Sequence, residues 1–373
     1  MRRSRRLHLL SLLGAGALLF GACSGAASPS ATSQASASQP AASQPAASQP
    51  AASEPGTSAS AEPAASEMPG TKEFSVAFTS IGMSSAPFLA ALDSLRDEGY
   101  TIETPEVAES ELVTQGVASG EFAFGSGANN STLTAVDAGA DIKLVVNRVN
   151  NEWTLYTRTD IADCAGLAGK RLAIHSEGAV STAMVRNYIE SACPGTEPTY
   201  IVIAGSPNRL AALLADEIDA SPLELTDATT VDLEAGDRFK LLTSLSQDLP
   251  DLQTTSVYVN GSFAEENPGT VLAVVKALLE QFRLIEGDAA YLQGIAEEYV
   301  GDALDADAIG PATEKYVELD MFPVDGGLTE ENLQYTAEFF GPDGTGAVER
   351  VLELDEFADL SFLEMALDEL GSE

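Results

Sequence analysis

An apolar run, a turn of small residues and a helical pattern follow one another between Leu167 and Tyr188. Residues 172–174 (LAI) are predicted as a buried strand, Gly178 lies in the turn, and the helical pattern begins near Ser181. Such a turn directs unpaired backbone N–H groups toward the space above the sheet. Because enzymes and binding proteins both use this arrangement, the turn alone does not distinguish between them.

The same order of apolar strand, small or polar turn and helix recurs along the chain. Alternating strands and helices predict an α/β fold with mainly parallel sheets, in which ligands bind at the carboxyl ends of the strands. The body of the chain is long enough for two lobes, so we expect their turns to face a shared cleft. Strands are predicted at residues 74–78, 101–103, 122–124, 142–146, 153–158, 172–174, 200–204, 240–242 and 255–259. Helices are predicted from Pro87, at 110–118, 132–138, from 181, and at 209–214, 268–285, 289–299, 329–339 and 362–370.

The start of the chain reads as an export signal. Four arginines precede an apolar stretch at residues 9–20, which is too short to span a membrane stably. Residues 19–24, LFGACS, resemble the lipobox of bacterial lipoproteins, in which the cysteine is lipidated and becomes the mature N-terminus; Phe20 departs from the usual smaller residue. We therefore expect residues 1–22 to be a lipoprotein signal peptide and Cys23 to anchor the protein to the outer face of the cell membrane. An ordinary signal peptide with an incidental Cys23 is the alternative.

Residues 23–70 have the composition of a tether. They consist largely of alanine, serine, proline and glutamine, with AASQP at 41–45 and 46–50 and AASEP at 51–55. Such a segment cannot bury a core, and we expect it to be disordered. A lipidated cysteine, a tether and a globular body describe a protein that is held at a membrane and works beside it.

The net charge limits the kinds of partner that the protein can bind, and the cysteines bear on the compartment in which it works. The formal charge is −38, and removal of residues 1–22, with four arginines and no acid, leaves about −42. This charge repels nucleic acid and anionic lipid. Besides Cys23, the chain has Cys164 before the strand of the opening motif and Cys193 after its helix. Because an exported protein can keep a disulfide, we expect these two to pair rather than to stay free thiols.

Six segments of the body, in this order, resemble the substrate-binding proteins of bacterial ABC importers, in the branch that takes nitrate, sulfonates, taurine or thiamine-pyrimidine precursors. The resemblance covers about residues 72–370, and it implies a two-lobed type II periplasmic-binding-protein fold with a hinge. Residues 71–157 and 255–373 would form lobe 1, and residues 158–254 lobe 2. The segments are LVTQGVASGEFAFGSG (112–127), DAGADIKLVV (137–146), RTDIADCAGLAGKRLAIHSEGA (158–179), RLAALLADEIDA (209–220), FAEENPGTVLAVVKAL (263–278) and DLSFLEMAL (359–367).

The resemblance also implies some of the ligand contacts. In the family the turn after the first strand touches the ligand, which makes Ser80, Met83 and Ser84 candidates, although serines at a helix start commonly only cap the helix. Ala179 and Ser181 lie where relatives present helix N–H groups to an oxyanion, and such groups attract anions without a basic side chain.

Other candidates come from the residues themselves, each with an alternative. Asn129 and Asn130 suit recognition of a neutral polar ligand or capping of a helix. Trp153, the sole tryptophan, would stack on a planar ligand or fill the junction of the lobes. His175 is a ligand donor or a structural histidine. Glu224 suits an amine or a ring N–H if it points into the cleft, and says nothing about the ligand if it points outward.

The leading functional hypothesis is a solute-binding lipoprotein, not an enzyme. The sequence has no HExxH, GxSxG, CxxC or P-loop motif, and we expect no metal or cofactor. The expected partners are a small molecule and the permease subunits of an ABC importer, and we expect a monomer. The alternatives are a thiamine-pyrimidine-synthase-like enzyme, whose relatives carry a cysteine-rich metal motif and a cofactor-linking lysine, and a ligand-sensing extracellular lobe. A nitrogen heterocycle such as a thiamine precursor fits Trp153, the two asparagines and Glu224 slightly better than nitrate, sulfonate or taurine.

Overall fold

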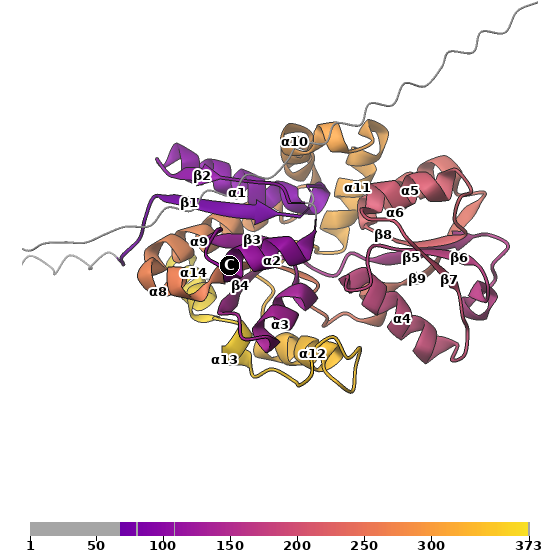
Figure 1. The fold of residues 1–373 in the computed structure, drawn as a ribbon. Helices are drawn as coiled ribbons and strands as arrows, with labels where there is room; N and C mark the ends of the chain where they lie inside the picture. Colours follow the sequence, from indigo (N-terminus) through magenta and orange to yellow (C-terminus); the bar gives the residue numbers. More distant parts are fainter. Residues whose placement is uncertain (1–67, 80, 108, 372–373) are drawn as a thin grey trace, which may run out of the picture. The chain divides into compact units, whose positions relative to one another are not determined.

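The computed structural model describes residues 68–79, 81–107 and 109–371, and within them the strands form two five-stranded sheets (Figure 1). The first sheet has the order β2-β1-β3-β10-β4, made of β1 (Glu73–Phe78), β2 (Thr101–Glu103), β3 (Phe124–Ala128), β4 (Ile142–Val149) and β10 (Thr255–Asn260). The second has the order β7-β6-β8-β5-β9, made of β5 (Thr154–Arg158), β6 (Arg171–Ile174), β7 (Thr199–Val202), β8 (Ala220–Leu223) and β9 (Phe239–Ser244).

Each sheet joins a parallel half to an antiparallel half. β1 pairs in parallel with β2 and β3, whereas β10 is antiparallel to both β3 and β4. In the second sheet β6 is parallel to β7 and β8, and β5 is antiparallel to β8 and β9. The predicted parallel strands thus supply half of each sheet, and the strands that bring the chain over from the other sheet, β10 and β5, add antiparallel pairs. One edge of the first sheet therefore holds the carboxyl ends of β1, β3 and β4.

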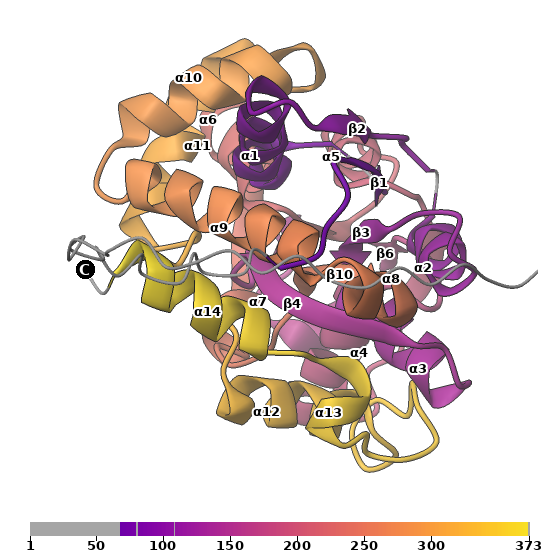
Figure 2. The ribbon, with the colours of Figure 1, turned by 90° about the vertical axis from the view of Figure 1, so that its left-hand side faces the viewer.

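Helices flank both sheets, and we call each sheet with its helices a lobe (Figures 1 and 2). The first lobe contains α1 (Ala86–Asp97), α2 (Ser110–Ala118), α3 (Asn129–Asp137), α8 (Gly261–Glu266), α9 (Pro268–Ile285), α10 (Ala289–Tyr299), α11 (Ala306–Glu318), α12 (Glu330–Phe340), α13 (Leu354–Phe357) and α14 (Ser361–Leu370). The second contains α4 (Val180–Ala192), α5 (Ser206–Leu214), α6 (Leu225–Ala235) and α7 (Leu245–Asp248). Short 3₁₀ turns are η1 (Met83–Ser85), η2 (Cys164–Leu167) and η3 (Gly301–Ala303).

The long helix α9 is a main support of the first lobe. Pro268 occupies its first turn, where the missing N–H costs nothing, and its apolar residues recur at helical spacing. Val271, Val275, Leu278 and Phe282 are fully buried. Figure 2 shows α14 lying alongside α9. The predicted bounds of this helix, 268–285, are confirmed.

The position of β3 differs from the expectation. The strand was predicted at residues 122–124 and the next helix from residue 132, but β3 is Phe124–Ala128, and α3 begins directly at Asn129. A Cβ on Gly125 would lie 2.4 Å from the ring of Tyr258 on the neighbouring β10. The packing of the sheet therefore requires glycine at this position. The small residues of this segment resemble those of a turn, and for that reason a strand was not predicted here.

Two helices of the site were not expected from the sequence, α6 and α11. The sequence of α6, LTDATTVDLEA, is rich in β-branched and short polar residues, which have low helix propensity. α11 carries Pro311 in its interior, which normally argues against a helix. Packing overrides propensity in both: α6 buries Leu225, Ala228 and Val231, and α11 buries Ile309, Ala312 and Tyr316.

Within the described residues the chain crosses between the lobes twice. It leaves β4 for β5 through residues 150–153 and returns from β9 to β10 through residues 245–254. β5 begins at Thr154, so residues 154–157 lie in the second sheet although the expected start of lobe 2 is residue 158.

Within the second lobe, Cys164 and Cys193 form a disulfide, with their Cα atoms 6.0 Å apart. The bridge joins the turn η2, before β6, to the end of α4. None of the described helices combines the length and the apolar character that a membrane span requires.

Candidate ligand-binding site

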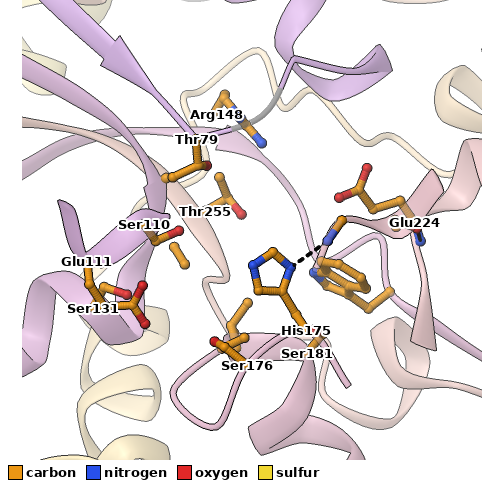
Figure 3. Close-up of a pocket in the computed structure, with 17 residues that line it drawn as sticks. Thr79, Ser110, Glu111, Ser131, Arg148, His175, Ser176, Ser181, Glu224 and Thr255 are labelled. Carbon is orange, nitrogen blue, oxygen red and sulfur yellow. Dashed lines mark hydrogen bonds between the residues drawn. The ribbon is translucent and has the colours of Figure 1, made fainter. Parts of the chain in front are cut away.

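The strand ends of both sheets converge on one cavity of about 80 Å³ (Figure 3). From the first lobe, Thr79 directly follows β1, Ala128 ends β3 and Arg148 lies near the end of β4. From the second lobe, His175 directly follows β6 and Glu224 directly follows β8. The shared cleft expected from the strand–turn–helix pattern is therefore present as a cavity between the carboxyl ends of strands.

Among the described residues, five helices begin at the wall of this cavity: Ser110, the first residue of α2, lines it, and for the other four helices the preceding residue does. The residues that precede their first turns are Ala128 for α3, Ala179 for α4, Gly205 for α5 and Glu224 for α6. None of these four residues caps its helix with a side-chain hydrogen bond. The first N–H groups of each helix lack intrahelical partners, and the helix dipole adds positive potential there. The cavity can thus bind an oxyanion or another acceptor group through the backbone alone.

His175 stands between the two sides of the cavity in Figure 3. Its Nδ1 accepts a hydrogen bond of 3.1 Å from the backbone N–H of Gly205. Burial, and to a lesser degree the positive charge of Arg209, lower the pKa of His175, so the ring is neutral at pH 7. In this tautomer Nε2 carries the proton, and His175 can donate it to a ligand.

Arg148 lies on the first-lobe side of the cavity and is 8% exposed. Its guanidinium donates to the hydroxyls of Ser85 (3.3 Å), Ser126 (3.4 Å) and Ser84 (3.3 Å). Its Nε has no hydrogen-bond partner among the described residues, and no carboxylate there lies within ion-pair distance of it. Burial lowers the pKa of Arg148, while Glu152 and Glu224 oppose that shift. A buried guanidinium without a bonded carboxylate is suited to pair with an acceptor group of a ligand.

A second cavity of about 70 Å³ adjoins the first. Both cavities are lined by Arg148, Gly205, Ser206 and Glu224, so these residues form their common wall. The second cavity also reaches Asp227 in α6. Together the cavities extend from the start of α4 to the start of α6, and a ligand that fills both would contact both lobes.

Glu152 acts electrostatically on Glu224, which lies in the wall of the second cavity. Glu152 lies in the crossover before β5, is 4% exposed, and accepts a hydrogen bond from the hydroxyl of Tyr316 in α11. Burial raises the pKa of Glu152, whereas Tyr316, Arg148 and Ser84 lower it. The crossover between the lobes therefore carries a carboxyl group that a helix of the first lobe holds in place.

Trp153 and Arg209 form a buried pair on the second-lobe side. The guanidinium carbon of Arg209 lies 5.6 Å from the centre of the Trp153 ring. Arg209 donates to the carbonyl oxygens of Pro222 (3.0 Å) and Ile203 (3.3 Å). Trp153 also lines the first cavity, so both roles expected from the sequence, packing and ligand contact, are open to it.

The structure brings most of the predicted residues together. Trp153, His175, Ala179, Ser181 and Glu224 line the first cavity. Two more residues, Met83 and Ser84, line the second. Ser80 and the expected lipidation site Cys23 lie outside the described residues.

The two asparagines lie outside both cavities. Asn129 is fully buried and donates to the carbonyl oxygen of Gln253, because α3 starts earlier than expected and turns this side chain into the first lobe. Asn130 donates a hydrogen bond to the carbonyl oxygen of Gly178 in the second lobe. Asn130 thus joins the two lobes beside the site instead of lining it.

Sequence reasoning missed Arg148, Glu152, Arg209 and Tyr316. Arg148 offered a signal, because it is a charged residue near the carboxyl end of a largely apolar strand, β4. Tyr316 offered none, because it comes from α11, far along the chain from Glu152. Among residues 68–79, 81–107 and 109–371, no three histidine, cysteine or acidic side chains are grouped so that they could hold a metal ion.

Comparisons with known proteins agree with this architecture. The family described as NMT1/THI5 like has a model that matches residues 86–283. No sequence among the curated proteins matches the chain.

Several solved structures share the fold at low identity. A ligand-binding component of an ABC-type import system from Staphylococcus aureus, with zinc bound, has 12% identity and a TM-score of 0.66 over 79% of this chain and 99% of that one. The alkanesulfonate-binding protein SsuA from Xanthomonas axonopodis pv. citri, bound to MOPS, has 16% identity and a TM-score of 0.62 over 78% and 99%. The periplasmic nitrate-binding protein NrtA from Synechocystis PCC 6803 has 11% identity and a TM-score of 0.63 over 81% and 90%.

Proposed function

Since the chain belongs to the NMT1/THI5-like family, we propose that it is the solute-binding component of an ABC importer and captures a small organic molecule between its lobes. The observation that carries this proposal is the cavity lined by strand ends and helix starts of both lobes. Capture would proceed by closure of the lobes around the crossovers, and delivery by opening at the permease subunits. No step of this cycle needs catalysis.

The ligand we propose has two kinds of polar group. Helix N–H groups, the Nε2–H of His175 and Arg148 together favour an acceptor or anionic group. Glu224, in the common wall of the two cavities, favours an N–H group. A nitrogen heterocycle such as a thiamine precursor and an aminosulfonate such as taurine both meet this description, whereas nitrate has no N–H group to donate to Glu224.

The enzyme alternative receives no support from the described residues. The resembling synthases need a cysteine-rich metal motif, and both cysteines of the described part are joined in a disulfide. The site is suited to capture a ligand by motion of the lobes and to release it unaltered.

We also propose that Cys23 carries the lipid anchor and that residues 24–70 tether a monomeric body to the outer face of the membrane. Mass spectrometry of the N-terminal peptide of the exported protein tests this. A diacylglyceryl-modified Cys23 is the expected result, and an unmodified N-terminus at another residue would contradict it.

Native mass spectrometry of the purified body tests the capture function directly. We expect a co-purified small molecule, and we expect Ala179→Leu to lose it, because the larger side chain fills the cavity at the start of α4. Ala215→Leu makes the same change at an exposed position after α5 and should keep the molecule. Retention by Ala179→Leu would show that the molecule binds elsewhere.

A further inference from the structure

Five ionisable groups surround the common wall of the two cavities. Three are carboxyl groups, of Glu152, Glu224 and Asp227, and two are guanidinium groups, of Arg148 and Arg209; all four neighbours act electrostatically on Glu224. With all five ionised, three negative and two positive charges leave one net negative charge at a place where Glu224 is partly exposed and the other four groups are buried. Such a charge is costly unless a proton or a cation neutralises it.

Among the described residues, Glu224 is the carboxyl of this group that has no hydrogen-bond or ion-pair partner. Glu152 accepts a hydrogen bond from Tyr316, and Asp227 is hydrogen-bonded by Ser206. The carboxyl of Glu224 has no hydrogen bond or ion pair to a described residue. Its Oε2 faces the other lobe, 3.8 Å from where a Cβ would stand on Gly82. Figure 3 shows Glu224 on the side of the cavity opposite Ser110 and Glu111.

We propose, building on the solute-binding function, that the ligand carries one ammonium or amidinium group, that this group binds beside Glu224 at the common wall, and that its binding releases one proton from Glu224 to solvent. The cation takes the place of the proton, so the group of five charges stays neutral in both states. Arg148, which lines the same wall and has an unpartnered Nε, holds the acceptor end of the same ligand. Recognition therefore selects dipolar molecules over simple anions.

The electrostatics set the direction of the pH dependence. Burial, Glu152 and Asp227 raise the pKa of Glu224 to about 8, against the opposing effect of Arg209 and Arg148. Tyr316 also faces Glu224, and its own pKa is raised well above the ordinary value, so it stays neutral. His175 is already neutral above pH 7 because burial lowers its pKa. We expect the affinity for a cationic ligand to rise about tenfold per pH unit up to about pH 8 and then to level off, as release of one proton requires.

Matched pairs of small molecules, one amine and one alcohol of the same skeleton, supply the probes. The set includes 2-aminoethanesulfonate with 2-hydroxyethanesulfonate, and the aminomethyl and hydroxymethyl forms of 4-amino-2-methylpyrimidine. Thermal shift identifies binders, and calorimetry at pH 7 in buffers of different ionisation enthalpy counts released protons. We expect amines to bind more tightly than their alcohols, with close to one proton released per ligand.

Two substitutions on one helix sharpen the test. Glu224→Gln keeps the size and the polarity of the side chain but cannot titrate, so it should abolish proton release, flatten the pH dependence and weaken amine binding at least about tenfold. Glu234→Gln makes the same change at an exposed position of α6 and should behave as the unaltered protein does. The proton count on the unaltered protein stands even if the first variant folds poorly.

The outcomes separate this inference from the function on which it rests. Alcohols or simple sulfonates that bind as tightly as the amines, amine binding without proton release, or no amine binding at all would each overturn it. In those cases a co-purified molecule lost in Ala179→Leu would still support capture. If no such molecule exists and no compound binds, the capture function fails as well.

Discussion

Arg148 places a positive charge at the point where the two cavities meet. Three serine hydroxyls hold its terminal nitrogens, and no carboxylate among the described residues pairs with it. Hydroxyls fix a guanidinium in position without neutralising it, so its charge stays available to a ligand. Glu224 on the opposite lobe gives the complementary donor or negative charge. The site is dipolar at the scale of single residues.

Removal of the Tyr316 hydroxyl tests how much its hydrogen bond to Glu152 contributes to the stability of the protein. Tyr316→Phe deletes the donor to Glu152 and also the acceptor for the Thr226 hydroxyl. A buried hydrogen bond to a charged acceptor contributes about 1.5–3 kcal/mol, and we expect the free energy of unfolding to fall by about that amount. Urea denaturation measures it. Tyr335→Phe, which keeps the stacking on Phe339, should change stability little; equal losses in both variants would contradict a role for the Glu152 contact.

The titration of Glu224 should also appear in stability without any ligand. Its folded-state pKa, about 8, lies above that of an unfolded glutamate, about 4.3, so the folded protein binds the extra proton between these values. Stability from this group is therefore present at pH 5 and is lost as the pH rises toward 8 and beyond. Relative to the unaltered protein, Glu224→Gln should gain stability progressively from pH 5 to pH 8 in urea unfolding. A pH-independent difference would show that Glu224 does not hold this proton.

At the scale of elements, the lobes depend on how strands and helices meet. β3 passes so close to the ring of Tyr258 on β10 that glycine is needed at position 125. α6 and α11 pack against each other across the lobes, with Lys315 of α11 bonded to Asp232 of α6 at 3.0 Å. These contacts join elements that are distant in the chain, and they set the positions of Glu152, Glu224 and Tyr316.

Gly125→Ala tests the close approach of β3 and β10. The added Cβ would lie 2.4 Å from the Tyr258 ring, which cannot move aside within a packed sheet. We expect the free energy of unfolding to fall by about 1–3 kcal/mol or more. Gly294→Ala, at an exposed position of α10 with no atom within 4 Å of the new Cβ, should instead gain about 0.5–1 kcal/mol. A neutral Gly125→Ala would mean that the strands are farther apart.

The disulfide is the covalent tie of the second lobe. It spans 29 residues of sequence and encloses β6 and α4, so its removal restores entropy to the unfolded chain. The double change Cys164→Ser and Cys193→Ser should lower the free energy of unfolding by about 3–4 kcal/mol. Alkylation and mass mapping of the exported protein check the pairing itself. Free thiols at both positions would contradict it.

The features that could be predicted from the sequence are those that depend on local contacts. The strands with apolar runs and the helix 268–285 were predictable, because hydrophobic period and caps are encoded within each segment. The start of α3 was not predictable, because the glycines of β3 are required by their contact with Tyr258, which is more than 120 residues away in the chain. Likewise, His175 was predictable from its place after a predicted strand and Ala179 from the resemblance to the family, whereas Glu224 follows β8, which was not predicted as a strand. Glu152 and Tyr316 become a pair only through tertiary packing.

At the scale of the whole body, two lobes face each other across the site and touch beside it. Asn130 of the first lobe donates to the carbonyl oxygen of Gly178 in the second, and α11 bonds to α6 on the other side. Two chain crossovers connect the sheets. Two crossovers can serve as a hinge for a closure motion, in which the ligand adds contacts that only the closed form makes.

Small-angle scattering of the body tests this account most directly. The co-purified molecule is first removed by mild denaturation and refolding, and the scattering curve is recorded before and after it is added back. We predict a smaller radius of gyration with the molecule bound, and no change for Ala179→Leu. An identical curve with and without a molecule that binds in the cavity would contradict capture by closure of the lobes.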